Sequence, residues 1–256
     1  MTSVAPARES HAAAAPDAPL REMAIPGTHA RVVDLLRAVQ APGPNVRVLD
    51  IGAGQGALSA RLHEAGYAVS ACDLFPEMFR AKGVECLGVD ANGRLPYPDR
   101  SFDLAVAVEL VEHLDGHRAL YSEAARILKP GGALVFTTPN ISSFKSRLSF
   151  LMTGYFYSFP PLDPANDNPV NQHLASFTVD RHRFMLGRCG LRLERLMTDK
   201  RQSSSLVWAW LAPLVRLLAR RRWGEGEGVR LQNSSEALFG RKLVVIARRP
   251  LEGHAP

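Results

Sequence analysis

Cysteine is scarce in this chain. Its 256 residues include three, Cys72, Cys86 and Cys189. So few cysteines, so widely separated, exclude a disulfide framework and a cysteine-rich zinc cluster. We therefore interpret them as reduced and mostly buried thiols, and we expect the protein to be cytoplasmic.

Long hydrophobic runs are also lacking. No stretch of about 18 uncharged apolar residues occurs, which excludes an ordinary transmembrane helix. Residues 1–19 are rich in alanine, proline and small polar residues, and Arg8, Glu9 and Asp17 interrupt the hydrophobic run that a secretory signal would need. We expect residues 1–19 to be a disordered tail and residues 250–256 a short second tail.

A strong excess of one charge sign is absent as well. The chain has 31 Lys and Arg against 25 Asp and Glu, a net charge of +6. The basic residues that stand out are grouped late in the chain, at Arg216, Arg220, Arg221, Arg222, Arg241, Lys242, Arg248 and Arg249. Because no base-stacking module or continuous basic groove is visible, we expect no nucleic-acid partner. The length suits one α/β domain, which we place at residues 20–249.

The most informative stretch is VRVLDIGAGQGALS at residues 46–59. Its apolar first half predicts a buried parallel strand, and its end predicts a helix over residues 57–65. Between them glycines occupy alternate positions, Gly52, Gly54 and Gly56. Glycine permits positive φ and close approach of a ligand, and a helix N-terminus directs amide groups at it. This loop therefore predicts a polar ligand.

A second predicted strand, over residues 67–72, runs into Asp73. A carboxylate at that point can accept both hydroxyls of a ribose. The spacing of Gly52, Gly54 and Ala57 together with Asp73 also satisfies a dinucleotide fingerprint. The residues up to this point thus leave an NAD-dependent oxidoreductase open.

The order of the later signals distinguishes these classes. Asp50 lies two residues before the first glycine, a third strand ends at residues 89–91, and further strands are predicted over residues 101–109 and 128–140. This succession resembles the class I S-adenosylmethionine-dependent methyltransferases, and the resemblance covers roughly residues 35–249.

The resemblance implies an α/β, Rossmann-like, doubly wound fold: a seven-stranded sheet with one antiparallel strand, at residues 242–247, helices on both faces and a helical cap insertion. It implies S-adenosylmethionine as cofactor, with a helix such as the one predicted after Gly27 covering it. The implied cofactor-binding residues are Asp50, Gly52, Gly54, Gly56, Asp73, Leu74, Asp90, Ala91 and Glu109. Of these, Asp50 would help to hold the amine and Asp90 would meet the adenine, although both also suit a role as turn caps.

The sequence Glu109-Leu-Val-Glu-His113 follows the fourth predicted strand. If the chain becomes helical at Glu109, then Glu109, Glu112 and His113 share one helix face near the expected methyl group. Two carboxylates and an imidazole suit Mg or Mn, which could acidify an acceptor hydroxyl. With His173 downstream, the pattern is similar to metal-dependent O-methyltransferases of ubiquinone biosynthesis and to small-RNA 2′-O-methyltransferases, which implies His173 as the fourth metal ligand.

A metal-free interpretation stays open. Glu109 would then close the cofactor cleft, and His113 or His173 would be the catalytic general base, since an imidazole titrates near working pH. His182 is a third and weaker candidate, because Arg181 and Arg183 suggest a solvated helix face.

Two segments interrupt the regular alternation. Residues 141–180 carry many aromatics, which a surface loop cannot leave in water without a partner, so we expect an acceptor-side cap. Residues 203–237 form an apolar and basic insertion. Within it, residues 206–223 combine tryptophans and arginines in a manner typical of a membrane interface. This composition is equally compatible with peripheral membrane contact and with packing on the core or on a second subunit, and the oligomeric state stays open.

Taken together, these residues predict a methyltransferase acting on oxygen, because a base or metal helps to remove a hydroxyl proton. The Asn-Pro-Pro-Tyr signature of N-methylation is missing after the fourth strand. The expected acceptor is a small phenolic or quinone-like molecule, or a lipid-linked sugar. The alternatives are a non-catalytic cofactor-binding partner protein and an NAD-dependent oxidoreductase.

Overall fold

The computed structural model describes residues 19–166, 168, 170 and 172–253. All but the last residue of the tail predicted at residues 1–19 therefore lies outside the described residues. Of the second predicted tail, residues 250–253 are described, and Glu252 there pairs with Arg100 at 2.6 Å.

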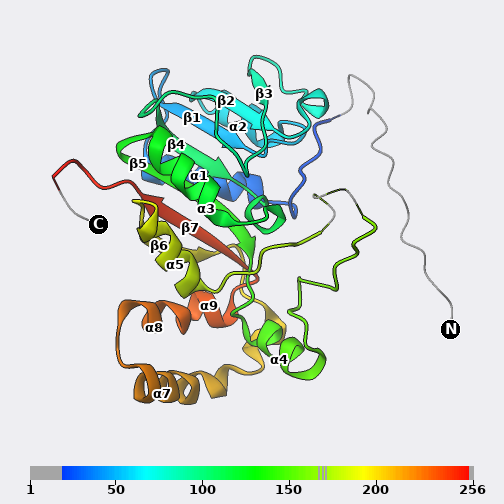
Figure 1. Ribbon diagram of the computed structural model, residues 1–256, viewed down its shortest axis with the longest axis vertical. Helices are drawn as coiled ribbons and strands as arrows, with labels where there is room; N and C mark the ends of the chain where they lie inside the picture. Colours follow the sequence, from blue (N-terminus) through cyan, green and yellow to red (C-terminus); the bar gives the residue numbers. More distant parts are fainter. Residues whose placement is uncertain (1–18, 167, 169, 171, 254–256) are drawn as a thin grey trace.

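A seven-stranded sheet forms the centre of the molecule (Figure 1). Its strands lie in the order β3-β2-β1-β4-β5-β7-β6. Their bounds are β1 Arg47–Ile51, β2 Ala68–Asp73, β3 Cys86–Gly88, β4 Phe102–Ala107, β5 Leu128–Pro139, β6 Arg192–Thr198 and β7 Lys242–Arg248. Strand β7 runs antiparallel to both of its neighbours, and the other pairs are parallel. The predicted fold, with its one antiparallel strand, is confirmed.

Helices cover both faces of this sheet. They are α1 Thr28–Val39, α2 Ala57–Glu64, α3 His117–Ile127, α4 Phe144–Thr153, α5 Val179–Arg188, α6 Ser203–Leu206, α7 Ala212–Trp223, α8 Glu227–Gln232 and α9 Ser235–Phe239, with 3₁₀ turns η1 Pro76–Met78, η2 Val111–His113 and η4 Ala209–Leu211. None of the helices in the described part of the chain combines the length and the apolar character needed to cross a lipid bilayer.

The strand sequences explain why both faces are covered. In β1, Leu49 and Ile51 join a core cluster with α3 and α5, whereas Val48 joins a second cluster with α1 and α2. Successive side chains of a strand point to opposite faces, so a continuous apolar run needs cover on each side. The central strands therefore expose only their ends to ligands.

Strand β5 begins at Leu128, as predicted, directly after α3 ends at Ile127. Residue Leu128 pairs with Phe102 of β4, and the next pair joins Ala133 to Leu104. Residues 129–132 therefore form an irregularity within the ladder, where glycine and proline are tolerated.

The two predicted insertions pack on each other below the sheet, in the lower half of Figure 1. Phe144 of α4, Ala212 of α7 and Leu238 of α9 belong to one small core cluster. Asn140, which follows β5, reinforces the junction: its amide donates to the carbonyl oxygens of Ala237 at 2.9 Å and Gly240 at 2.8 Å. A single buried amide thus ties the cap to the later insertion.

Candidate active site

A cavity of about 370 Å³ opens at the carboxyl ends of β1, β2 and β4. All of the predicted cofactor residues except Gly56 line it, namely Asp50, Gly52, Gly54, Asp73, Leu74, Asp90, Ala91 and Glu109. Glu112, His113 and His173 lie along the same wall. Ligands of α/β sheets bind at the carboxyl ends of the parallel strands. Predicted site residues from separate parts of the chain therefore meet in one place.

Two glycines of the loop have different roles. At Gly52, with φ +75°, an added Cβ would lie 2.9 Å from Leu110, so the loop passes too close to the end of β4 for a side chain. Gly56 does not line the cavity. It precedes α2 with φ +86°, and a Cβ there would lie 2.7 Å from Ala81 and Phe79. The expectation that Gly56 borders the ligand therefore stays a prediction, whereas packing against these neighbours explains why this position is glycine.

The carboxylate of Asp73 is held by backbone amides. One oxygen accepts from Gly54 N–H at 2.7 Å and the other from Phe75 N–H at 2.8 Å. Each carboxylate oxygen has a second lone pair, so a ribose diol can still bind. Asp90 similarly accepts from Asn92 N–H at 2.8 Å while it lines the cavity, so its two interpretations, turn cap and cavity wall, apply together.

Asp50 is the buried charge of this cavity. The side chain is 2% exposed and its carboxylate accepts a 2.6 Å hydrogen bond from the Ser59 hydroxyl. Burial raises the pKa of Asp50 to about 6, with the charge of Asp73 a smaller cause. No salt bridge joins Asp50 to a cation among the residues that the structure describes, and such a carboxylate suits the ammonium group of a bound amino acid. The cavity therefore fits the two polar ends of S-adenosylmethionine, with Asp50 for the amine and Asp73 for the ribose.

A segment before α1 that was not predicted to reach the site covers the glycine loop. Arg21 and Met23 line the cavity, and a Cβ added at Gly54 would lie 2.9 Å from the sulfur of Met23. The Arg21 amide donates to the Gln55 side chain at 3.0 Å. The segment has no periodic pattern, so apolar Met23 just before a helix was the only available signal. From α1, the expected covering helix, His29 also reaches the cavity.

Glu109 does not take the predicted position. Its backbone is left-handed, with φ +52°, so the chain is not helical there and η2 begins only at Val111. The carboxylate accepts a 2.7 Å hydrogen bond from the Thr137 hydroxyl and forms an ion pair with Lys242. Glu109 is thus held away from the group that Glu112 and His113 belong to, and its assignment as a metal ligand is corrected. It lines the cofactor cavity as expected.

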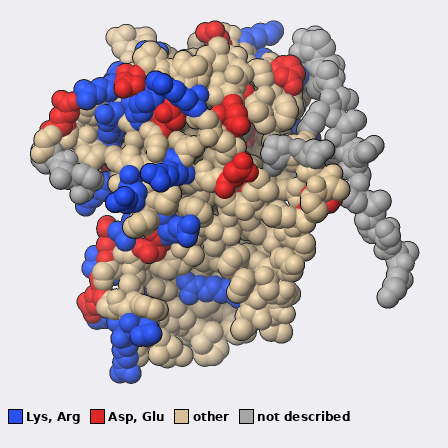
Figure 2. Space-filling view, viewed as in Figure 1, with Lys and Arg blue, Asp and Glu red and all other residues tan. Residues whose placement is uncertain are grey.

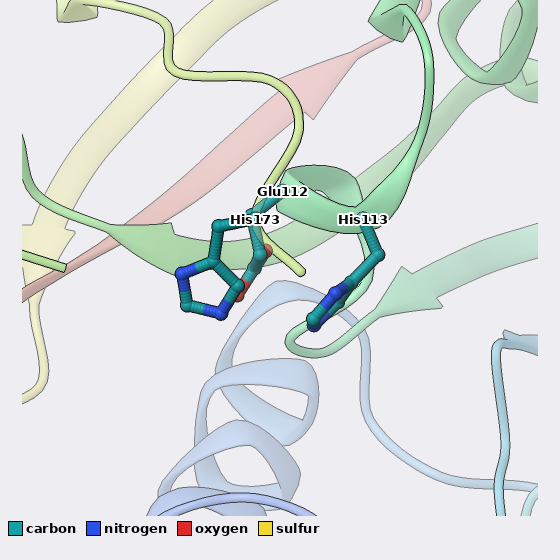
Figure 3. A group of neighbouring side chains, drawn as sticks. All are labelled: Glu112, His113 and His173. Carbon is teal, nitrogen blue, oxygen red and sulfur yellow. The ribbon is translucent and has the colours of Figure 1, made fainter. Parts of the chain in front are cut away.

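Glu112, His113 and His173 point toward one another (Figure 3). One possible ligand atom from each lies within 4.8 Å of the others. His173 comes from the irregular cap segment, which is tied to η2 because the Glu112 carbonyl accepts from Leu174 N–H at 2.7 Å and Ala175 N–H at 3.1 Å. This contact explains how residues so distant in sequence meet.

Hydrogen bonding sets the orientation of both imidazoles. His113 Nδ1 lies 2.9 Å from the Gln172 carbonyl, and His173 Nδ1 lies against the Ser158 carbonyl. Because a carbonyl only accepts, Nδ1 carries the proton and Nε2 of each neutral ring keeps its lone pair. Both rings therefore hold Nδ1 against a carbonyl, and both residues line the cavity.

Glu112 is fully buried, and neither of its carboxyl oxygens has a hydrogen-bond partner in the described part of the chain. Burial raises the pKa of Glu112 well above the ordinary glutamate value, and the charge of Glu109 adds to this. An unpartnered buried carboxyl is rare unless it serves a ligand or a proton. Glu112 is thus a feature of the site that packing alone does not explain.

His182 is corrected in its surroundings. It is 1% exposed, and its Nδ1 lies 2.8 Å from the Tyr121 hydroxyl, among His117 and Phe177. Burial lowers the pKa of His182 well below the ordinary value. The solvated face suggested by the flanking arginines is therefore wrong, because the ring turns inward, and His182 does not line the cavity.

Residues 49–136 match the family model described as a methyltransferase domain. The chain is 32% identical over 162 residues to a demethylmenaquinone methyltransferase of Tropheryma whipplei, covering 57% of this chain and 66% of that protein. It is 34% identical over 110 residues to a ubiquinone biosynthesis O-methyltransferase of Xanthomonas oryzae pv. oryzae, covering 37% and 43%. The matches thus span less than two thirds of the first relative's length and less than half of the second's.

Solved structures are similar over most of the chain. A putative methyltransferase from Bacillus halodurans has a TM-score of 0.55 at 19% identity, covering 85% of this chain and 98% of that one. An S-adenosylmethionine-dependent methyltransferase from Mesorhizobium loti has a TM-score of 0.53 at 20% identity, covering 84% and 96%. Residues 49–136 therefore form a methyltransferase domain, and the strand order, the glycine loop and the fold of the chain are similar to those of the class I S-adenosylmethionine-dependent methyltransferases.

Proposed function

We propose that the protein transfers the methyl group of S-adenosylmethionine to a hydroxyl oxygen of a small acceptor. The observation that supports this most is the shared cavity: Asp50 and Asp73 at one part of its wall, and His113 and His173 at another. The carboxylates suit the cofactor and the imidazoles suit a proton transfer. One cavity thus provides both requirements of O-methylation.

The chemistry demands little from the protein beyond placement. When bound, the cofactor supplies an electrophilic methyl group on a sulfonium, which an oxygen attacks in line with the departing sulfur. The chain must hold both partners in line and exclude water. Residues 20–27 and α1 cover the cofactor side, with Met23 against the glycine loop.

The imidazoles accept the proton in this proposal. As the acceptor oxygen gains the methyl group, its hydroxyl proton moves to the Nε2 lone pair of His113 or His173, and the sulfur leaves as a neutral thioether. A positioned general base of this kind contributes about 10²- to 10⁴-fold to a rate. The neighbouring carboxyl of Glu112 can stabilise the imidazolium that results.

The same three side chains also suit a divalent metal, as a second form of this proposal. The donor set of Glu112, His113 and His173 contains two imidazole nitrogens and one carboxylate oxygen. Such a mixed set favours Mn over Mg, which prefers oxygen alone. Treatment with EDTA separates the two forms: lost turnover restored by Mn supports the metal, whereas unchanged turnover supports a metal-free base.

For the acceptor, we propose a phenolic or quinone-like ring first and a lipid-linked sugar second. Similarity to a demethylmenaquinone methyltransferase and to a ubiquinone biosynthesis O-methyltransferase supports the ring. The aromatic residues of the cap around Tyr155 and Tyr157 suit the same class. Following radioactive methyl from the cofactor into lipid, aqueous and polymer extracts tests this choice, and label confined to polymer would contradict it.

We also propose that the surface formed by α4 and by the region from α6 to α7 makes peripheral contact with a membrane. The outer faces of α4 and the region from α6 to α7 expose Phe150, Leu151, Met152, Val207, Trp210, Leu214, Leu218 and Trp223. Figure 2 shows that this part of the surface is mostly uncharged, with basic side chains gathered at its lower left margin. Arg221 and Arg222 end α7 beside Trp223, which suits an anionic interface. This face would bring a lipid-carried acceptor to the enzyme.

Two alternatives have distinct tests. A non-catalytic cofactor-binding protein would bind S-adenosylmethionine without labelling any extract. An NAD-dependent oxidoreductase would be stabilised against heat by NAD and not by S-adenosylhomocysteine.

A further inference from the structure

A second cleft, of about 610 Å³, adjoins the cofactor cavity. Glu109 and His173 line both spaces. His173, the proposed base, therefore lies between a molecule bound in the second cleft and the cofactor cavity. Its other walls come from the start of α4, from the cap near Tyr157 and from the segment between β6 and α6.

Positive charge gathers in this cleft. Among the described residues, five basic side chains line it, Lys145, Lys200, Arg201, Arg241 and Lys242, against one carboxylate, that of Glu109. Two of these cations have acidic partners, since Arg241 pairs with Asp199 and Lys242 with Glu109.

The other three cations have no acidic partner among the residues that the structure describes. Lys145 Nζ lies 3.2 Å from the centre of the Tyr157 ring, whereas Lys200 and Arg201 are exposed. Charges of one sign in a concave site concentrate an oppositely charged ligand there. The pairing of Lys242 also matters, because it neutralises Glu109, the one lining group that would repel an anion.

Hydroxyl and amide groups complete the lining, from Ser158, Gln202, Ser203 and Ser204. Cationic side chains combined with hydroxyl donors bind phosphate and carboxylate through charge-assisted hydrogen bonds. Binding an apolar or neutral acceptor would need none of these cationic and hydroxyl groups. Their presence in the cleft therefore favours an anionic ligand.

We propose that this cleft is an acceptor subsite for an anionic group, a phosphate ester or a carboxylate, whose carrier presents a hydroxyl to His113 and His173. The inference rests on the proposed O-methylation and names the acceptor chemistry that the site selects. Acceptors that carry such a group enter with the anion against Lys145, Lys200 and Arg201.

The test uses three ring compounds that differ in charge: phenyl phosphate, benzoate and phenol. Binding of each to the full chain is measured by titration calorimetry, with and without S-adenosylhomocysteine. We expect at least one anion to bind more tightly than phenol and to weaken as salt is added. Tighter binding of phenyl phosphate indicates a phosphate ester, and tighter binding of benzoate indicates a carboxylate.

Variants locate the site. In the double variant Lys200→Gln/Arg201→Gln, which changes two exposed residues, we expect anion affinity to fall about tenfold. The matched control Arg188→Gln/Arg192→Gln removes the same charge from exposed positions on α5 and β6, and should leave that affinity unchanged.

Equal affinity for all three compounds overturns the inference, since the anionic group would then contribute nothing to binding. Equal losses in both double variants also overturn it, since binding would then reflect the overall charge of the protein. The cofactor titration keeps the two proposals apart. If S-adenosylhomocysteine binds and neither anion does, the subsite is wrong and the proposed function stands. If S-adenosylhomocysteine fails to bind, the proposed function is wrong.

Discussion

Lys242 forms an ion pair with Glu109, which joins the start of β7 to the loop after β4 across 133 positions of sequence. Both side chains are nearly buried, at 8% and 13% exposure. The Thr137 hydroxyl donates to the same carboxylate, and the Glu109 amide donates back to Thr137 at 3.0 Å. These contacts hold Glu109 in its left-handed conformation, at the border between the cofactor cavity and the cationic cleft.

Removing the lysine tests this arrangement. Lys242→Met leaves the Glu109 carboxylate buried without its cation, so we expect the free energy of unfolding to fall by about 3 kcal/mol. Denaturant unfolding measures the change. The double variant Glu109→Gln/Lys242→Met removes both charges and should recover much of that loss. A single variant as stable as the wild type would contradict the importance of the pair.

Asp50 predicts a pH dependence of cofactor binding. Its pKa in the free protein is raised to about 6, so below that pH the carboxyl is neutral and offers no counter-charge to the cofactor's ammonium. We expect affinity for S-adenosylhomocysteine to rise as the pH increases toward about 6 and to level off above it. Titration calorimetry from pH 5 to about 8 measures this, and Asp50→Asn should flatten the profile.

The same carboxyl affects folding stability with the opposite sign. Because the folded-state pKa of Asp50 lies above its ordinary value of 3.8, its contribution to stability is largest at low pH and is lost as the pH rises through about 6. Removing the ionisable group with Asp50→Asn should therefore reduce the loss of stability between these values. An unchanged pH profile for both binding and stability in this variant would contradict the assignment.

The histidines are tested through the chemical step. Replacing His113 or His173 by Gln should lower the turnover rate by about 10²- to 10⁴-fold while the affinity for S-adenosylhomocysteine is kept. His182→Gln is the comparison, since that ring lies in the core, and it should affect stability before catalysis. If turnover is unchanged when both His113 and His173 are replaced, the base form and the metal form of the proposal are both wrong.

Membrane contact is tested with vesicles. The double variant Trp210→Ser/Trp223→Ser changes side chains that are 69% and 70% exposed, and we expect it to reduce co-sedimentation with anionic phospholipid vesicles about tenfold or more. Phe184→Ser/Leu251→Ser, with 57% and 60% exposure elsewhere on the surface, is the matched control and should bind as the wild type does. Absence of wild-type binding to vesicles of any charge would contradict the contact.

The sequence predicted the sheet and the cofactor side of the site because both depend on local patterns. Apolar runs that end in Gly52, Asp73 or Asp90 identify strand ends, and parallel strands bring such ends together. Even Asp90, which follows β3 by two residues, reaches the cavity as expected. Errors of a residue or two in strand bounds thus left the set of lining residues nearly intact.

The predictions from sequence failed where tertiary contacts determine the conformation of a residue. Glu109 was placed on a helix face by spacing alone, but Thr137 and Lys242, both distant in sequence, fix its backbone. The arginines beside His182 suggested that its ring faces solvent. The ring instead points into the core, where it hydrogen-bonds to Tyr121. The covering segment around Met23 has no periodicity, so one apolar residue before α1 was the signal for its place over the glycine loop.

The central claim is that an adenosine cofactor occupies the cavity between Asp50 and Asp73, and calorimetric titration of S-adenosylhomocysteine into wild type and Asp73→Ala tests it most directly. We expect one site per chain in the wild type and an affinity at least about tenfold lower in the variant, since a ribose diol loses its charged acceptor. No heat of binding with the folded wild type, or equal affinity in both proteins, would contradict the account.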